Sequence, residues 1–182
     1  MMDPNRDVRM DLDSLDGLPT IELPEGYRIT TAADWDAPDI EARWLGLLRA
    51  AFPEVRDWSP QRWRAHITER PQFDPAGVFF IVHAGDCVAT AFAWRDDPDE
   101  TRCGRVHWVA SHPDHRGKQL GRLVTLAVLH HLRGCGFPRA FLETQLYRLP
   151  AIRVYLKLGF HPTPADDEER ERWGEAVAAV GF

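Results

Sequence analysis

The sequence is short of the residues that build disulfide frameworks and metal sites. It has 182 residues and only three cysteines, Cys87, Cys103 and Cys135, none of which forms a CxxC pair. This spacing indicates neither a disulfide framework nor a structural zinc site. Eight histidines are present, but no His, Cys and carboxylate spacing matches a zinc-site pattern, so we predict no metal cofactor.

Excess basic charge and long apolar runs are also missing. Twenty-two Lys and Arg face 28 Asp and Glu, which gives a net charge of −6. This balance disfavours a nucleic-acid partner, because neutralising phosphates requires a basic surface. No apolar run approaches the roughly 18–20 residues needed to cross a bilayer. The acidic, polar start does not read as a secretory signal, and we expect a soluble, cytoplasmic protein that binds no membrane.

What is present is the composition of a globular protein, with 44% hydrophobic and 27% charged residues. We predict an extended lead-in over residues 1–24, which are rich in acidic residues and proline, and a single domain over residues 25–182. Alternating or β-branched runs predict strands at 27–31, 78–83, 87–94, 105–111 and 139–144. Helical periodicity and capping patterns predict helices at 39–51, 60–69, 120–132, 150–158 and 166–180. The expected fold is mixed α/β, a twisted, mostly antiparallel central sheet flanked by helices on both faces.

The most informative stretch runs from a strand through two turns into an apolar helix, residues 106–122. The first amides of such a helix lack intrahelical partners and carry the positive end of the helix dipole. Gly117 and Gly121 leave room for a close approach. Three basic side chains add positive charge: Arg116, Lys118 and Arg122. These features describe an anion site suited to a pyrophosphate.

Other phosphate-binding patterns fit this stretch less well. A P-loop requires Ser or Thr after the lysine, and Gln119 follows Lys118. A dinucleotide fingerprint requires GxGxxG, whereas Gly117 and Gly121 are four residues apart. A structural strand–helix turn with solvated charges remains an alternative reading of the same residues.

The stretch resembles the cofactor motif of the GNAT N-acetyltransferases, Arg/Gln-x-x-Gly-x-Gly/Ala, with Arg116 and Gly121 at matching positions. Gln119 stands where the family usually has its first motif glycine. We expect Gln119 to be accommodated, because residues at a helix N-terminus usually have negative φ.

A second segment, Leu149–Phe160, resembles the family pattern Asn-x-x-Ala-x-x-Leu-Tyr-x-Lys-x-Gly-Phe. The matching residues are Ala151, Tyr155, Lys157, Gly159 and Phe160. The Asn position holds Arg148, so the role of that amide does not carry over. The two motifs occur in the family's order, and the resemblance covers residues 76–162, with a cofactor core at 105–162.

The resemblance implies a GNAT fold and acetyl transfer from acetyl-CoA, as co-substrate, to an amine acceptor by direct attack in a ternary complex. In this family a bulge splays the strand before the motif, and the thioester sits in the resulting wedge. The strand edge would pair with the pantetheine arm, and the loop and helix amides would hold the pyrophosphate. The implied cofactor-binding residues are Val109, Ala110, Ser111, Arg116, Gly117, Lys118, Gln119, Leu120, Gly121 and Arg122.

The resemblance also suggests catalytic residues. Tyr155 would act as general acid towards the departing thiolate, and the alternative is a tyrosine that packs the helix. Glu143, five residues before the Asn position, would act as general base, and the alternative is an exposed strand-end glutamate. His107 is a lesser candidate base.

The sequence does not decide the role of the tryptophans, the choice between an enzyme and a binding module, or the oligomeric state. Four tryptophans in the N-terminal third suit either an acceptor-side wall or buried packing: Trp35, Trp44, Trp58 and Trp63. A non-catalytic acyl-CoA-binding regulatory module is the alternative function. Dimerisation is common in the family, so a homodimer is an expectation that the resemblance brings.

Overall fold

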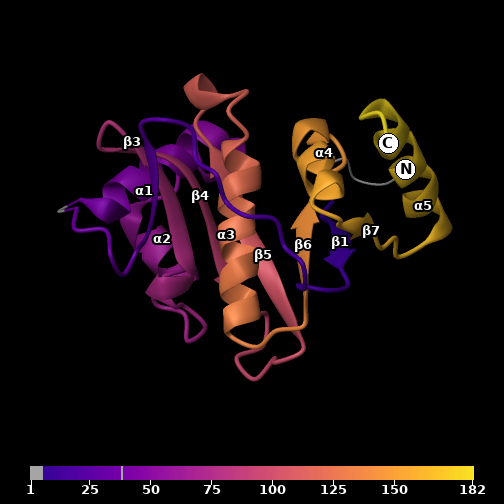
Figure 1. Ribbon diagram of the computed structural model, residues 1–182, viewed down its shortest axis with the longest axis horizontal. Helices are drawn as coiled ribbons and strands as arrows, with labels where there is room; N and C mark the ends of the chain where they lie inside the picture. The colour runs from indigo at the N-terminus through magenta and orange to yellow at the C-terminus, as the bar shows by residue number, and fades with distance from the viewer. Residues whose placement is uncertain (1–5, 38) are drawn as a thin grey trace.

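The computed structural model describes residues 6–37 and 39–182, and it folds into a mixed α/β structure (Figure 1). Seven strands form one sheet in the order β2-β3-β4-β5-β6-β1-β7. The strands are β1 Val8–Leu12, β2 Tyr27–Thr31, β3 Val78–His83, β4 Asp86–Trp94, β5 Cys103–Ser111, β6 Arg139–Thr144 and β7 His161–Pro162. Neighbouring strands run antiparallel except for the parallel pair β5 and β6. The predicted fold class is confirmed.

Helices and short 3-10 turns surround this sheet. The helices are α1 Ile40–Ala51, α2 Pro60–His66, α3 Leu120–Gly134, α4 Leu149–Lys157 and α5 Asp167–Ala179. The 3-10 turns are η1 Pro53–Val55, η2 Pro75–Gly77 and η3 Pro113–His115. Along the part of the chain that the structure describes, no helix combines the length and apolar character needed to cross a bilayer.

The N-terminal residues form more of the fold than an extended lead-in. Val8–Leu12 is a strand whose side chains alternate between buried and accessible positions, and it pairs antiparallel with β6 from Val8 opposite Thr144 to Leu12 opposite Ala140. The other edge of β1 pairs with β7. The N-terminal segment therefore lies inside the sheet, between two strands from the C-terminal part of the chain.

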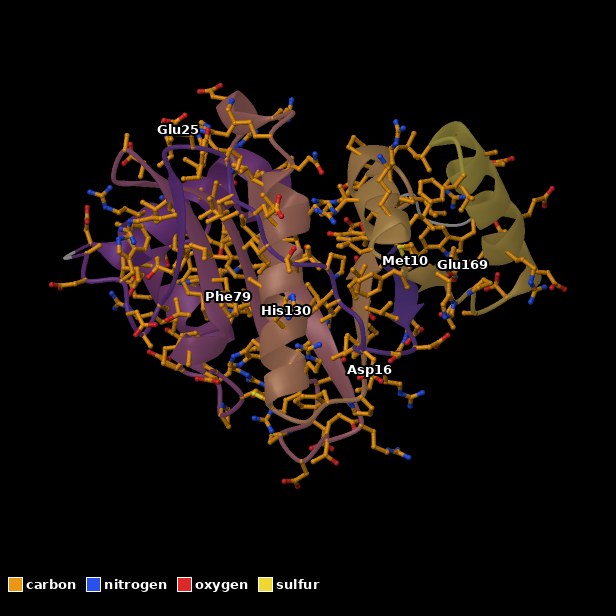
Figure 2. All side chains as sticks on the ribbon, viewed as in Figure 1. Met10, Asp16, Glu25, Phe79, His130 and Glu169 are labelled. Atoms are coloured by element: carbon orange, nitrogen blue, oxygen red, sulfur yellow. The ribbon has the colours of Figure 1, made fainter. Side chains whose placement is uncertain are left out.

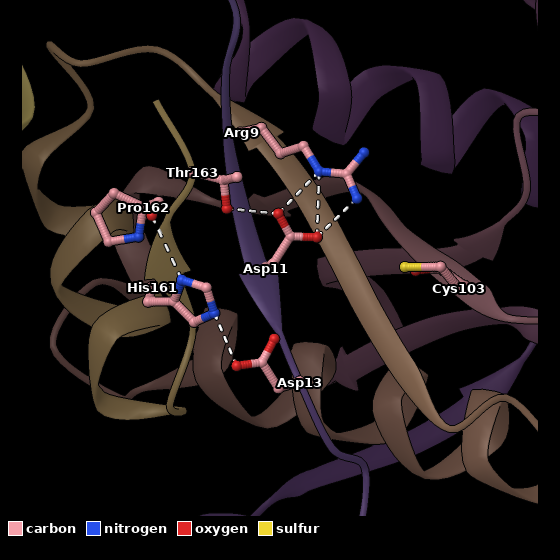
Figure 3. Close-up of polar contacts among 8 residues, drawn as sticks. Arg9, Asp11, Asp13, Cys103, His161, Pro162 and Thr163 are labelled. Carbon is pink, nitrogen blue, oxygen red and sulfur yellow. Dashed lines mark hydrogen bonds and ion pairs between the residues drawn. The ribbon is translucent and has the colours of Figure 1, made fainter. Parts of the chain in front are cut away.

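Polar contacts tie β1 to the strand beside it (Figure 3). The Asp11 carboxylate accepts hydrogen bonds from Arg9 Nε at 2.9 Å and from Thr163 Oγ1 at 2.5 Å. His161 Nε2 lies 3.0 Å from a carboxylate oxygen of Asp13. The contacts of Thr163 with Asp11 and of His161 with Asp13 join residues about 150 positions apart, so the two ends of the domain are packed together.

Two apolar cores cover the two faces of the sheet. Helices α1 and α2 pack over strands β3 to β5 through an aromatic cluster in which the rings of Trp44 and Trp63 lie 4.6 Å apart. Helix α3 packs on the other face, with Leu126, Val128 and Leu129 fully buried. Figure 2 shows the side chains on the ribbon and labels His130, which lies on α3. Central strands covered on both faces read as continuous apolar runs, as β3 and β4 do.

The helix ends show how local sequence positions these elements. Ser59 Oγ accepts from the backbone N–H of Arg62 at 3.1 Å and starts α2, as predicted, although the helix ends at His66 rather than at residue 69. Asp39 precedes α1 as expected, but its carboxylate accepts from Arg43 Nε at 2.7 Å and makes no cap. Helix α5 is capped by Asp166 and buries Trp173, so it is part of the core rather than a surface helix only.

Candidate active site

Strands β5 and β6 pair at one end and separate at the other. Their parallel pairing runs from Cys103 opposite Arg139 to Val106 opposite Leu142 and stops there. Just beyond, β5 carries one extra residue against β4, in a bulge where Trp108 has φ 48°. The bulge lies where the family resemblance placed it, and it opens a wedge between the two strands.

Two hollows meet at this wedge. The loop-side hollow, of about 680 Å³, lies between the β5 edge, the loop before α3 and the start of α4. The sheet-side hollow, of about 280 Å³, lies between the splayed parts of β5 and β6. Both are lined by the same five residues at their junction: Phe52, Val109, Arg148, Ala151 and Tyr155. An elongated molecule can therefore lie in the first hollow and meet a second molecule from the other.

The loop-side hollow ends at the N-terminus of α3. Gln119 is the N-cap residue, and its side chain makes no capping hydrogen bond, so the first-turn amides are left for another partner. Gly117 has φ 81°, a conformation that favours glycine. A Cβ at Gly121 would meet only Ser111 Oγ, at 3.5 Å, so packing within the protein does not require a glycine at that position.

The expectation for Gln119 is wrong. Its φ is 57° and its ψ 21°, in the left-handed region, and not at the negative φ that we expected. The position needs glycine-like backbone freedom, which the family glycine has and Gln lacks. The loop is therefore strained at the residue that departs from the family pattern.

The predicted cofactor residues divide into two groups. Arg116 lines the loop-side hollow. Lys118 and Arg122 instead line a separate hollow of about 390 Å³ beside the N-terminal segment at Pro19 and Pro24. The structure brings together in the loop-side hollow Val109, Ala110, Ser111, Arg116, Gly117, Gln119, Leu120 and Gly121.

Tyr155 lies at the junction of the two hollows. It is only 6% exposed, and its ring contacts Phe160 with centroids 6.0 Å apart. Burial raises the pKa of the Tyr155 hydroxyl to about 12, although the nearby charge of Arg148 acts in the opposite direction. The hydroxyl is therefore protonated at neutral pH and can serve as a hydrogen-bond donor.

Glu143 lines the sheet-side hollow near the end of β6. Its carboxylate forms an ion pair with Arg105, whose other nitrogen pairs with Asp96 at 2.6 Å. This bridge from β5 to β6 fixes the direction of the carboxylate, which remains about one-third exposed. A fixed carboxylate beside the wedge is suited to accept a proton from an incoming amine.

His107 also lines the sheet-side hollow, among aromatic rings. Its ring lies 5.3 Å from that of Phe92 and 5.7 Å from that of Trp108. Burial, with a smaller effect from Arg105, lowers the pKa of His107 to about 3. A group with so low a pKa accepts protons poorly at neutral pH, which disfavours His107 as a general base.

Several residues that line the hollows lie outside the motifs and contact residues within or beside them. Arg148 Nη2 donates to Glu54 Oε1 at 2.6 Å, and the Arg148 guanidinium carbon lies 4.7 Å over the Phe52 ring. Asp7 also lines the sheet-side hollow, and its carboxylate accepts from Gln145. Phe52, Glu54 and Asp7 precede the segment that carries the resemblance, and no local sequence signal marks them.

The four N-terminal tryptophans pack away from the hollows. Trp35, Trp44 and Trp63 are buried in the core under α1 and α2. Trp58 and Trp63 contact Trp108 with centroids 5.7 and 6.0 Å apart and so support the bulge from behind. The packing alternative is therefore correct for this group, and none of the four lines either hollow.

The thiols do not take part in the wedge. All three cysteines are free, and none lines either hollow. Burial raises the pKa of the Cys87 thiol to about 12. Within the described residues no group of three or more His, Cys, Asp or Glu side chains is placed to hold a metal ion.

The comparisons with known proteins agree on one family. The model described as the acetyltransferase (GNAT) family matches residues 41–160. Mycothiol acetyltransferase of Thermobispora bispora is 36% identical over 151 residues, which cover 79% of this chain and 49% of that protein. Mycothiol acetyltransferase of Thermobifida fusca is 37% identical over 175 residues, covering 87% and 54%. The chain spans about half the length of the curated relatives that it matches.

Solved structures share the fold. A GCN5-related N-acetyltransferase from Sphaerobacter thermophilus matches with a TM-score of 0.67 and 22% identity, covering 88% of this chain and 50% of that one. A tandem GNAT protein from the clavulanic acid biosynthesis pathway matches with a TM-score of 0.64 and 24% identity, covering 87% and 50%. Together with the family model and the curated relatives, these matches show that the chain belongs to the GNAT acetyltransferase family.

Proposed function

We propose that the protein transfers the acetyl group of acetyl-CoA to a primary amine by direct attack in a ternary complex. The observation that carries the proposal is the meeting of two hollows at Tyr155, in the wedge where β5 and β6 separate. One hollow ends at unpaired helix amides, which suit a phosphate, and the other is lined by the Glu143 carboxylate. Transfer between two bound molecules requires such a junction.

Acetyl-CoA would lie in the loop-side hollow. The free edge of β5 at Val109–Ser111 would pair with the pantetheine arm, as in strand addition to a sheet. The amides from Gly117 to Arg122 and the Arg116 side chain would hold the pyrophosphate. The open space at Gly121 supports this fit, because a Cβ there would project beside Ser111 at the hollow and not into the protein core.

The amine would enter through the sheet-side hollow. Glu143 would accept a proton from the incoming ammonium, directly or through a water molecule. Tyr155 would donate a hydrogen bond to the sulfur as the thioester bond breaks. Full proton transfer from a hydroxyl with a pKa of about 12 to a thiolate, whose ordinary pKa is about 8.5, is uphill. A further group is therefore needed to stabilise the negative charge that develops on the sulfur.

The acceptor is proposed from the relatives and from the lining of the sheet-side hollow. The curated relatives are named mycothiol acetyltransferases, and we infer that a small amine related to mycothiol is the first acceptor to test. Three carboxylates line that hollow, those of Asp7, Glu54 and Glu143, together with the two arginines that pair with the glutamates, Arg105 and Arg148. The one excess negative charge of this lining would favour a cationic amine over an anionic acceptor.

The central experiment replaces Tyr155 with Phe and measures acetyl transfer by thiol release against a panel of amines. The ring and its packing remain, so CoA affinity should barely change. The turnover rate should fall by up to about 10²–10⁴, the scale of general acid catalysis and an upper limit for a hydroxyl that donates only a hydrogen bond. Unchanged turnover, under conditions where chemistry limits the rate, would remove Tyr155 from the mechanism. A wild-type protein that binds CoA but acetylates no amine would support a binding module instead.

A further inference from the structure

The residue at the position of the family's motif asparagine is charged in this chain and lies at the junction of the two hollows. Arg148 lines both the loop-side and the sheet-side hollow, together with Tyr155. Its guanidinium carbon lies 4.7 Å over the ring of Phe52, which also lines both. An asparagine could place an amide dipole there, whereas Arg148 places a full positive charge.

The guanidinium of Arg148 has N–H donors that make no hydrogen bond with the described residues. One side-chain hydrogen bond, from Nη2 to Glu54 Oε1 at 2.6 Å, anchors it to η1. The Nε–H is buried and has no partner among the described residues. An arginine carries five N–H donors, so the single contact with Glu54 leaves donors available for a ligand. The side chain is 19% exposed, and partial burial strengthens its interaction with any nearby charge.

We propose that Arg148 is a catalytic residue that binds the departing thiolate of CoA and stabilises its negative charge. The inference rests on the proposed acetyl transfer. In that step the amine lone pair attacks the carbonyl carbon, a C–N bond forms and the C–S bond breaks. The electron pair of the C–S bond stays on sulfur, beside the Arg148 guanidinium. Glu143, after passing the proton of the ammonium to water, accepts the surplus proton of the attacking amine, and the sulfur later takes a proton from water.

Glu54 would weaken the stabilisation of the thiolate by Arg148. Its carboxylate forms an ion pair with Arg148 and partly offsets the guanidinium charge. The arrangement therefore predicts opposite effects for two substitutions. Removal of the Arg148 charge should make the thiolate less stable, and removal of the Glu54 charge should make it more stable. A purely structural role, in which the pair ties α4 to η1, predicts no such opposition.

The test measures the pKa of the CoA thiol in its complex with the protein, by ultraviolet absorbance of the thiolate during a pH titration. The complex with desulfo-CoA supplies the blank. Arg148→Gln should raise the pKa of the bound thiol by about 1–2 units relative to wild type, the usual effect of losing one nearby opposite charge. Glu54→Gln should lower it. Arg148→Lys should keep most of the wild-type value, and Arg153→Gln, an exposed arginine on the same helix, should have no effect.

The outcomes separate this inference from the proposed function. If Arg148→Gln binds CoA and leaves the pKa of the bound thiol unchanged, the assignment is overturned. It is also overturned if Glu54→Gln and Arg148→Gln shift that pKa in the same direction. Should Arg148→Gln fail to fold, the Glu54→Gln titration decides alone, and the absence of a downward shift overturns the assignment. A wild-type protein that binds no CoA would refute the proposed function itself.

Turnover gives a second readout. If the thiolate is stabilised by Arg148 in the transition state, the rate of transfer in Arg148→Gln should fall by about tenfold for each unit of pKa shift. CoA affinity at a pH where the thiol is protonated should change little. Equal losses in affinity for CoA and for desulfo-CoA would indicate a role in holding the pantetheine arm and would contradict the assignment to sulfur.

Discussion

Replacing Gln119 with Gly should stabilise the protein, although Gly in the middle of a helix is destabilising. Gln119 has φ 57°, and a residue with a Cβ in the left-handed region costs roughly 1–2 kcal/mol relative to the right-handed one. Gly removes this cost but loses about 0.5–1 kcal/mol more conformational entropy on folding. The difference between these ranges is about 0–1.5 kcal/mol, and its midpoint is a gain of about 0.75 kcal/mol in the free energy of unfolding.

This gain should be visible in thermal unfolding. For a chain of 182 residues, 1 kcal/mol corresponds to about 2–4 °C in Tm, so Gln119→Gly should raise Tm by about 1–4 °C. Gln119→Ala keeps a Cβ at the same φ and should give no comparable rise. Ala84→Gly is the matched control, because Ala84 has φ 50° in the turn between β3 and β4, far along the chain from the loop-side hollow.

Calorimetry with CoA distinguishes a local effect on the loop from a general one. Ala84→Gly should raise Tm and leave CoA affinity unchanged, since Ala84 lines neither hollow. Gln119→Gly should raise Tm and bind CoA at least as tightly as wild type, because the backbone then takes the loop conformation without strain. A lower Tm in Gln119→Gly than in Gln119→Ala would refute the strain argument.

Three further predictions concern the site. Gly121→Val should lose CoA affinity by at least about 100-fold while the fold persists, because the branched side chain enters the space beside Ser111. Wild-type affinity of this variant, measured by calorimetry, would refute the phosphate placement. Gly174→Val on α5 is the control. His107, with a pKa lowered to about 3, binds fewer protons when folded than when unfolded, so its contribution to stability is complete above about pH 6.5 and falls by up to about 1.4 kcal/mol per pH unit down to about pH 3. Denaturant unfolding should therefore show a shallower acid dependence in His107→Gln, and identical slopes would contradict the burial effect. Glu143→Gln should remove the rising limb of the pH–rate profile, and a rising limb that persists would assign the base elsewhere.

Much of the fold follows from local patterns. Strands β2 to β6 and the long helix α3 were predicted because side-chain periodicity, turn residues and Pro or Gly punctuation act over a few residues. The two motifs likewise lie within single strand–turn–helix segments. β1 was missed since five residues that alternate between apolar and charged look extended, and only their pairing with β6 and β7 makes them part of the sheet.

The sequence alone predicted the family, which the comparisons confirm, and also the cofactor loop and the candidate pair Tyr155 and Glu143, because each lies within a contiguous stretch. The tertiary structure decided which side chains meet. It turned Lys118 and Arg122 away from the loop-side hollow, placed Gln119 at positive φ, and brought Glu54 to Arg148 across 94 positions of sequence. Which side chains meet depends on sheet register and on helix packing, and both are set by contacts between distant segments. No local sequence pattern therefore predicts these contacts.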